Sequence, residues 1–291
     1  MTAATVAQAL MSGLLMGLIY ALVAAGLSLI FGLMDVVNFA HGEALMLAMF
    51  ATLILHRVLG LDPLLLLPLV AALMFLLGMA IYRGLIARAL SVRFNRGMVQ
   101  IFVTFGLAIL IRGAAQFVFG TEFQSVTGTW LGDRTVALGP VFLPLPQLAA
   151  GFVCLIAFAL LLAISRTEFG RALEATREDR DAVALIGIDR DRIFALGWGL
   201  GLAAVGVAGT MLATFYYVSP DVGANFALIA YVTVALGGFG SVAGALAAGI
   251  AIGEVESMTA LFLEPSLKQV GVLAVYMLVL TVRPRGLFGT L

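Results

Sequence analysis

Long apolar runs separated by short polar segments make up most of this chain. A helix needs about 18 or more predominantly apolar residues to cross a bilayer, and several runs reach that length. We expect membrane-spanning helices within residues 6–32, 63–82, 98–119, 147–165, 193–216, 225–262 and 267–282. The pattern therefore predicts an all-α polytopic membrane protein, with one transmembrane domain over residues 1–291.

Glycine interrupts the longest apolar stretch, residues 225–262, near its middle. Gly237, Gly238 and Gly240 predict a break at about 237–241, with a short helix before it and a second helix after it. Splitting this stretch gives about nine crossings, with eight possible, some of them broken. Small residues at four-residue steps also predict close helix packing at Gly13/Gly17, Gly197/Gly201, Gly240/Gly244 and Gly249/Gly253.

A polar cluster at the start of residues 34–50 lies between apolar runs. On a helix, Asp35, Asn38 and His41 share one side, and Glu43 points nearly opposite to His41. Ionisable groups at membrane level are costly and tend to face a cavity or a partner. We predict that these four residues and the glycine break line or gate a polar pathway. The alternative is a short loop at the water interface.

Arg112 and Gln116 are a further polar pair, one turn apart in the span 98–119. They either extend to the far interface or line a polar path. We favour extension to the interface, because Gly120 ends the apolar run close by.

The loops carry most of the charge and predict the topology. Residues 83–96 hold several arginines and no acid, so the positive-inside rule places them in the cytoplasm, together with the basic C-terminus from Arg283. The longest charged segment, residues 166–192, mixes acids and bases, which suits a folded docking surface in water. Residues 120–146 hold one basic residue and are predicted as an external loop that could include a short hairpin.

A short helix over residues 170–187 is expected inside the charged cytoplasmic loop. Glu174/Arg177 and Arg177/Asp181 are neighbouring pairs on such a helix, and Gly187 offers a stop. A helix of this kind is rigid enough to transmit a displacement from a partner protein to the membrane helices. An ordinary solvated loop helix is the alternative.

Composition narrows the function classes. The chain is 63% hydrophobic and 11% charged with a formal net charge of zero, which argues against a soluble protein and against a basic nucleic-acid binder. Cys154 is the single cysteine, so there is no disulfide framework and no cysteine metal cluster. The motifs GxxxxGK[ST], HExxH and GxSxG do not occur, so we expect no enzyme and no cofactor in this chain.

Two kinds of transport protein remain. One is a permease subunit that is driven by a separate motor protein. The other is a self-contained ion-coupled carrier or channel for a small polar solute. An ion-coupled carrier needs acidic groups deep in its helices, and the deep segments hold almost none. The charged loop favours the motor-driven subunit.

Four stretches together resemble the permease family of branched-chain amino-acid ABC transporters: GLIYALVAAGLSLIFGLMDVVNFAHGEALMLAMF, GRALEATREDRDAVALIGID, VALGGFGSVAGALAAGIAIGEVES and RPRGLFG. The resemblance covers nearly the whole chain. It implies a multi-pass subunit of the bacterial inner membrane that pairs with a second, similar permease, two cytoplasmic ATPase subunits and a periplasmic substrate-binding protein. ATP and Mg would be bound by the ATPase subunits.

The resemblance also implies roles for the charged loop. The segment around Glu174 corresponds to the coupling loop that docks in the ATPase, which makes Arg171, Glu174, Arg177, Arg180 and Gly187 the candidate docking residues. This chain has EAT where the general importer pattern has EAA, and no Leu-Pro closes the segment. The implied function is uptake of branched-chain or related small amino acids by alternating access. Family members also carry other amino acids or small amides such as urea, so the substrate stays open.

Overall fold

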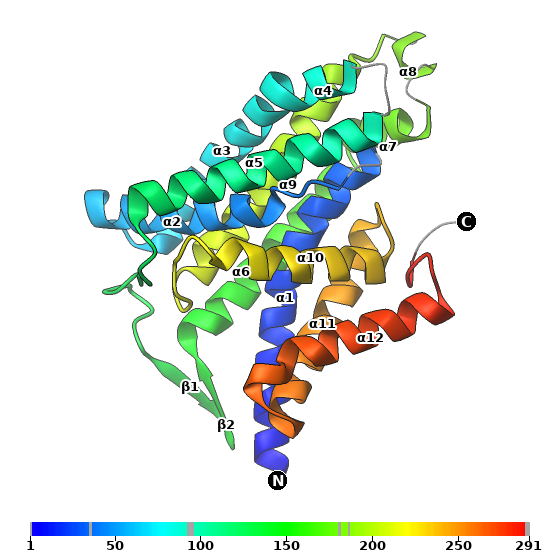
Figure 1. Ribbon diagram of the computed structural model, residues 1–291. Helices are drawn as coiled ribbons and strands as arrows, with labels where there is room; N and C mark the ends of the chain where they lie inside the picture. Colours follow the sequence, from blue (N-terminus) through cyan, green and yellow to red (C-terminus); the bar gives the residue numbers. More distant parts are fainter. Residues whose placement is uncertain (1, 35–36, 92–95, 180–181, 186, 289–291) are drawn as a thin grey trace.

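In the computed structural model, long helices pack around α1 (Ala3–Met34), which crosses the bundle from end to end (Figure 1). The structure describes residues 2–34, 37–91, 96–179, 182–185 and 187–288, so the predicted positions Asp35 and Arg180 lie outside the described residues. The other long helices are α2 (His41–Leu59), α3 (Pro63–Ile81), α5 (Arg96–Phe119), α6 (Leu145–Ser165), α9 (Arg190–Leu212), α10 (Val222–Gly237), α11 (Val242–Phe262) and α12 (Lys268–Val282). The short elements are the π-helical turn η1 (Tyr82–Ile86), α4 (Ala87–Ser91), β1 (Thr135–Leu138), β2 (Val141–Pro144), α7 (Glu168–Glu178), α8 (Ala182–Leu185) and the 3-10 turn η2 (Pro265–Leu267).

The all-α polytopic fold predicted from the sequence is confirmed. Among the described residues, eight helical stretches are long and apolar enough to cross a membrane, and α10 is a shorter apolar helix. The break at 237–241 is also confirmed, because α10 ends at Gly237 and α11 begins at Val242. Gly238 and Gly240 have φ angles of 98° and 80°, which glycine adopts without strain.

Small residues bring α1 and α11 into backbone contact. A Cβ atom on Gly13 would lie 2.9 Å from the carbonyl oxygen of Gly253, and one on Gly17 would lie 2.8 Å from that of Gly249. The two predicted packing pairs are therefore partners of each other. Only glycine allows two helix backbones to approach this closely.

A β-hairpin follows α5 and lies near the N-terminus, at the end of the bundle away from α7 (Figure 1). Strands β1 and β2 pair antiparallel, with Thr135 opposite Pro144. The side chain of Gln8 ties the hairpin to α1, because it donates to the carbonyl of Phe142 and accepts from its N–H, at 2.6 and 2.7 Å. The short hairpin considered for residues 120–146 is thus present.

The single helix expected over residues 170–187 is wrong. Helix α7 begins at Glu168, because the Thr167 side chain caps it by accepting from the N–H of Gly170, and it ends at Glu178. Asp179 is extended, with a φ of −146°, and separates α7 from α8. Aspartate competes for backbone hydrogen bonds and favours helix ends over interiors. Gly187 follows α8 with a φ of 85°, as a stop residue does.

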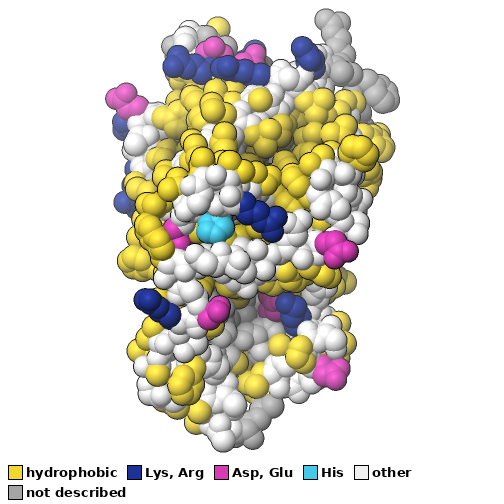
Figure 2. Space-filling view, turned by 90° about the vertical axis from the view of Figure 1, so that its left-hand side faces the viewer, with side chains coloured by type: hydrophobic (Ala, Val, Ile, Leu, Met, Phe, Trp, Pro, Cys, Tyr) yellow, Lys and Arg dark blue, Asp and Glu magenta, His cyan; other side chains and the backbone are white. Residues whose placement is uncertain are grey.

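Charged side chains gather along the end of the molecule that holds α7, above a wide band of hydrophobic side chains (Figure 2). The exposed charges of α7 are Glu168, Arg171, Glu174, Arg177 and Glu178. Leu173 and Thr176, on the other side of α7, are buried against the bundle. Helix α7 therefore offers one charged face to water while its other face is fixed to the membrane helices.

Candidate functional site

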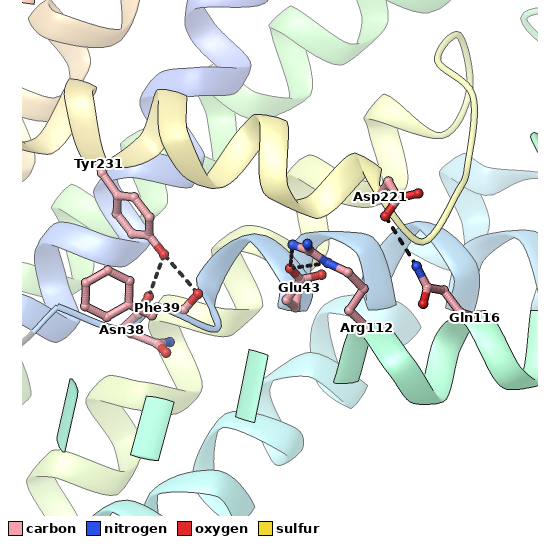
Figure 3. A network of polar contacts seen from close by, with 7 residues as sticks. All are labelled: Asn38, Phe39, Glu43, Arg112, Gln116, Asp221 and Tyr231. Atoms are coloured by element: carbon pink, nitrogen blue, oxygen red, sulfur yellow. Dashed lines mark hydrogen bonds and ion pairs between the residues drawn. The ribbon is translucent and has the colours of Figure 1, made fainter. Parts of the chain in front are cut away.

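An ion pair joins α2 to α5 beside α10 (Figure 3). Glu43, in the first turn of α2, is 2% exposed. Arg112 on α5 donates to its Oε1 atom from Nε at 3.1 Å, and also from Nη2. Gln116, one turn further along α5, donates to a carboxylate oxygen of Asp221 at 3.4 Å. Both residues point to partners on neighbouring segments and line the cavity between α2, α5 and α10, which is the alternative that the sequence left open.

The turn before α2 is held by α10. The Tyr231 hydroxyl donates to the backbone carbonyl of Phe39 at 3.0 Å and lies 3.2 Å from that of Asn38 (Figure 3). The side chain of Asn38, 2% exposed, accepts from the N–H of Ala40 at 3.1 Å. Asparagine commonly closes a turn by a bond of this kind to the backbone two residues on. These hydrogen bonds link the polar turn to α10, so a movement of one would displace the other.

A cavity of about 430 Å³ lies between α2, α5 and α10. Its polar wall contains the Glu43–Arg112 pair and Gln116, and its aromatic wall contains Phe39, Phe105 and Tyr231. Ligand pockets commonly have volumes of roughly 300–1,000 Å³ and combine apolar walls with a few polar groups. The second oxygen of Glu43, Oε2, is buried and has no hydrogen-bond partner among the described residues. A carboxylate oxygen in that state can accept a hydrogen bond from a bound solute.

His41 does not join this cavity. It is fully buried, and its Nε2 atom lies 2.9 Å from the carbonyl oxygen of Val23 on α1. The three-residue spacing placed it on the side of Asn38, but the chain before α2 is a turn rather than a helix, so the spacing does not apply. The structure places Glu43 in the wall of the cavity, Asn38 in the turn held by Tyr231, and His41 against α1.

The predicted coupling residues and the predicted glycine break meet at the other end of α10. Arg177 on α7 donates to the carbonyl of Gly240 at 3.4 Å. Gly240 has a φ of 80°, which favours glycine, and a Cβ atom there would lie 2.8 Å from the guanidinium and would displace the Arg177 side chain. Glu174, Arg177 and Gly240 line a cavity of about 190 Å³ between α7 and the membrane helices. Helix α7 therefore contacts the break directly.

None of the described residues forms a group of three or more His, Cys, Asp or Glu side chains that could hold a metal ion. Arg171 and Gly187 are exposed, on α7 and after α8 respectively. Tyr231 and Phe105 were missed by the sequence reasoning. An aromatic side chain in an apolar span has the same pattern whether it faces lipid or a cavity, so the sequence carried no signal for them.

A family model described as "Branched-chain amino acid transport system / permease component" matches residues 9–282. The chain belongs to this permease family. It is 27% identical to the high-affinity branched-chain amino acid transport system permease protein LivH of Escherichia coli K12, over 97% of this chain and 95% of LivH. It is 29% identical to the permease protein BraD of Pseudomonas aeruginosa, with the same coverage.

The permease also matches LivM of Escherichia coli K12, at 27% identity over 93% of this chain and 68% of LivM. Among solved structures, PsaBC from Streptococcus pneumoniae in complex with Fab matches with a TM-score of 0.45 and 15% identity, covering 94% of this chain and 92% of that chain. The resemblance drawn from the four sequence stretches is confirmed by the family match. This chain is a multi-pass membrane permease component.

Proposed function

We propose that this permease is one of two permease subunits of an ATP-driven importer in the bacterial inner membrane. It translocates branched-chain or related small amino acids by alternating access. The family match over residues 9–282 and the names of LivH and BraD support the substrate class. Matches to both LivH and LivM support a partnership between two similar permeases.

One observation carries the translocation role: the Glu43–Arg112 pair beside the cavity between α2, α5 and α10. An amino acid is a zwitterion, with an ammonium and a carboxylate that both need partners outside water. A carboxylate and a guanidinium side by side supply these partners while the site stays neutral overall. The aromatic wall of Phe39, Phe105 and Tyr231 suits an apolar side chain.

The contact between Arg177 and Gly240 supports a route for mechanical coupling. Closure of the ATPase subunits would displace α7, and Arg177 would carry that displacement to the break at Gly237, Gly238 and Gly240. The break ends α10, whose other turns hold Tyr231 and the cavity wall. A shift of α10 would therefore open or close the pathway, as rigid helices moving about a hinge do in other switching proteins.

The remaining roles complete the proposal. Two cytoplasmic ATPase subunits, which bind ATP and Mg, dock on the loop of residues 166–192, and a periplasmic binding protein delivers the substrate. The proposed docking residues are Arg171, Glu174, Arg177, Arg180 and Gly187, and the proposed pathway residues are Asp35, Asn38, His41, Glu43, Gly237, Gly238 and Gly240.

Uptake of radiolabelled L-leucine by proteoliposomes that contain the whole importer tests the translocation role. We expect Glu43→Gln and Arg112→Met each to reduce ATP-dependent uptake strongly, because each leaves one charge of the zwitterion without a partner. Arg57→Gln is the matched control, since Arg57 is exposed and, within the described part of the chain, donates to Gln124 at 2.9 Å. Normal uptake by both site variants would refute a role of the pair in translocation.

A further inference from the structure

A second cavity, of about 350 Å³, lies on the other face of α10. It is enclosed by α1, α10, α11 and the first residues of α12. Asn225, Phe226 and Ile229 of α10 line it, whereas Ala224, Ala227, Leu228 and Tyr231 of the same helix line the cavity with Glu43. Helix α10 therefore separates two cavities that share no lining residue in the described chain.

An ion pair lies in the wall of this second cavity. Glu256 on α11 is 6% exposed, accepts a hydrogen bond from the Tyr20 hydroxyl at 2.6 Å, and pairs with Nζ of Lys268 at 2.6 Å. The Lys268 side chain is 41% exposed, so it can move while Glu256 is held. The pair is neutral overall, and one member is fixed and the other is mobile.

Lys268 lies at a position where a cation lowers the stability of its own helix. It is the first residue of α12 and the only lysine in the sequence. The N-terminal end of a helix carries a partial positive charge, which disfavours a cation and favours an anion. A carboxylate bound there would interact with the ammonium of Lys268 and with the partial positive charge of this helix end. The local chemistry thus suits an anionic group, and among the described residues Glu256 is the carboxylate that pairs with Lys268.

The rest of the wall combines apolar and aromatic side chains with the polar side chains of Ser12, Asn225, Ser257 and Gln269. Met16, Phe226 and Ile229 line one side, and the Tyr20 ring packs against Phe226 with 5.9 Å between ring centroids. A charged pair beside the apolar side chains of Met16, Phe226 and Ile229 matches a small molecule that has two opposite charges at one end and a hydrocarbon group at the other.

We propose that this second cavity is a recognition site for a small zwitterion with an apolar side chain. The substrate ammonium replaces Lys268 on Glu256, and the substrate carboxylate binds between Lys268 and the N-terminus of α12. The hydrocarbon group lies against Met16, Phe226 and Ile229. This inference rests on the proposed function, which makes an amino acid the solute, and it adds a point of selection within the permease itself.

Direct binding to the whole importer in lipid nanodiscs, without the periplasmic binding protein, tests the site. The probe is radiolabelled L-leucine, competed with 4-methylpentanoate, which lacks the ammonium, and with leucinamide, which lacks the carboxylate. Both analogues should compete poorly with the wild type. Glu256→Gln should lower leucine affinity by about 10-fold or more, because a hydrogen bond to a charged group is lost. It should also raise competition by 4-methylpentanoate relative to leucine.

Lys268→Met should give the reverse ranking, with leucinamide gaining relative to leucine, because only the carboxylate of Glu256 remains. Glu264→Gln is the matched control. Glu264 is exposed, lies four residues before Lys268, and its carboxylate accepts a hydrogen bond only from Ser266 within the described chain. Leucine affinity and analogue ranking should not change in the control. If Glu256→Gln does not fold, the binding measurement on Lys268→Met tests the site by itself, since the Lys268 side chain is partly exposed and its removal disturbs the core less.

An unchanged analogue ranking in both variants would overturn the proposal and leave the pair as a structural link between α11 and α12. The proposed function fails separately, if the wild-type importer shows no ATP-dependent leucine uptake. Uptake by the wild type together with unchanged binding in both variants would refute this inference alone.

Discussion

The Glu43–Arg112 pair predicts unequal effects when its two partners are removed one at a time. Arg112→Met leaves the Glu43 carboxylate, whose side chain is 3% exposed, without a counter-charge. Glu43→Gln leaves a guanidinium whose side chain is 36% exposed and lines the cavity between α2, α5 and α10, into which it can turn. Leaving a buried charge unpaired costs about 3–5 kcal/mol, whereas loss of a partly exposed pair costs about 1 kcal/mol or less.

We therefore expect Arg112→Met to lower the free energy of unfolding by about 3 kcal/mol and Glu43→Gln to lower it by about 1 kcal/mol. The double variant should lose less than the sum, because no unpaired charge remains in the bundle. For a chain of 291 residues, an unfolding entropy of about 2.1 cal/mol/K per residue makes 1 kcal/mol correspond to roughly 1.6 °C in Tm. Arg112→Met should thus lower Tm by roughly 5 °C.

Cys154 provides the assay. It is the only cysteine and is fully buried in α6, so a maleimide dye reacts with it only when the helices separate. Dye fluorescence during heating of the detergent-purified permease then reports Tm for the wild type, both single variants and the double variant. Equal Tm shifts in the two single variants, or a double variant that loses the full sum, would refute the reasoning.

Three further predictions concern α7, α11 and α3. Glu174→Arg should weaken copurification of the ATPase, and Arg177→Ala should lower leucine uptake per ATP hydrolysed; undiminished values would contradict a docking and coupling role for α7. Gly249→Leu should abolish the folded monomer in size-exclusion chromatography, because even a Cβ atom at this position would lie 2.5 Å from a backbone atom of α1. Gly106→Ala is the control and should be tolerated, because its Cβ atom would meet nothing within 4 Å. Asp62→Ala should cost about 1–3 kcal/mol in thermal unfolding, since this buried carboxylate caps α3 and accepts from two backbone N–H groups at 2.9 and 2.6 Å; an unchanged Tm would contradict this.

Features set by local chemistry could be predicted from the sequence. The break between α10 and α11 followed from Gly238 and Gly240, which have the positive φ angles that other residues avoid. The packing role of Gly249 followed from small residues at four-residue steps. Which helix each pair meets did not follow, because the spacing on one helix holds no information about its neighbour. The end of α7 at Asp179 was missed since the charge pattern continues past it.

The candidate site depended on contacts between distant residues. Glu43 and Arg112 are 69 positions apart, and nothing near Arg112 indicates an acidic partner. Because Gly120 ends the apolar run close to Arg112, we predicted that the Arg112 side chain extends to the membrane interface. In the folded chain its guanidinium instead donates to the Glu43 carboxylate. The expectation that deep segments hold almost no acids also missed the importance of Glu43 and Glu256, both buried and each paired with a base. Pairing of this kind neutralises an acid in lipid, and only the tertiary structure reveals it.

The energy source is the most direct test of the proposed function. L-leucine accumulation should be measured in proteoliposomes that contain this permease alone, and in proteoliposomes that also contain the second permease, the ATPase subunits and the binding protein. The account predicts accumulation only with the complete set and ATP, and none by the permease alone under a proton or sodium gradient. Uphill accumulation by the permease alone, driven by an ion gradient without ATP, would contradict it.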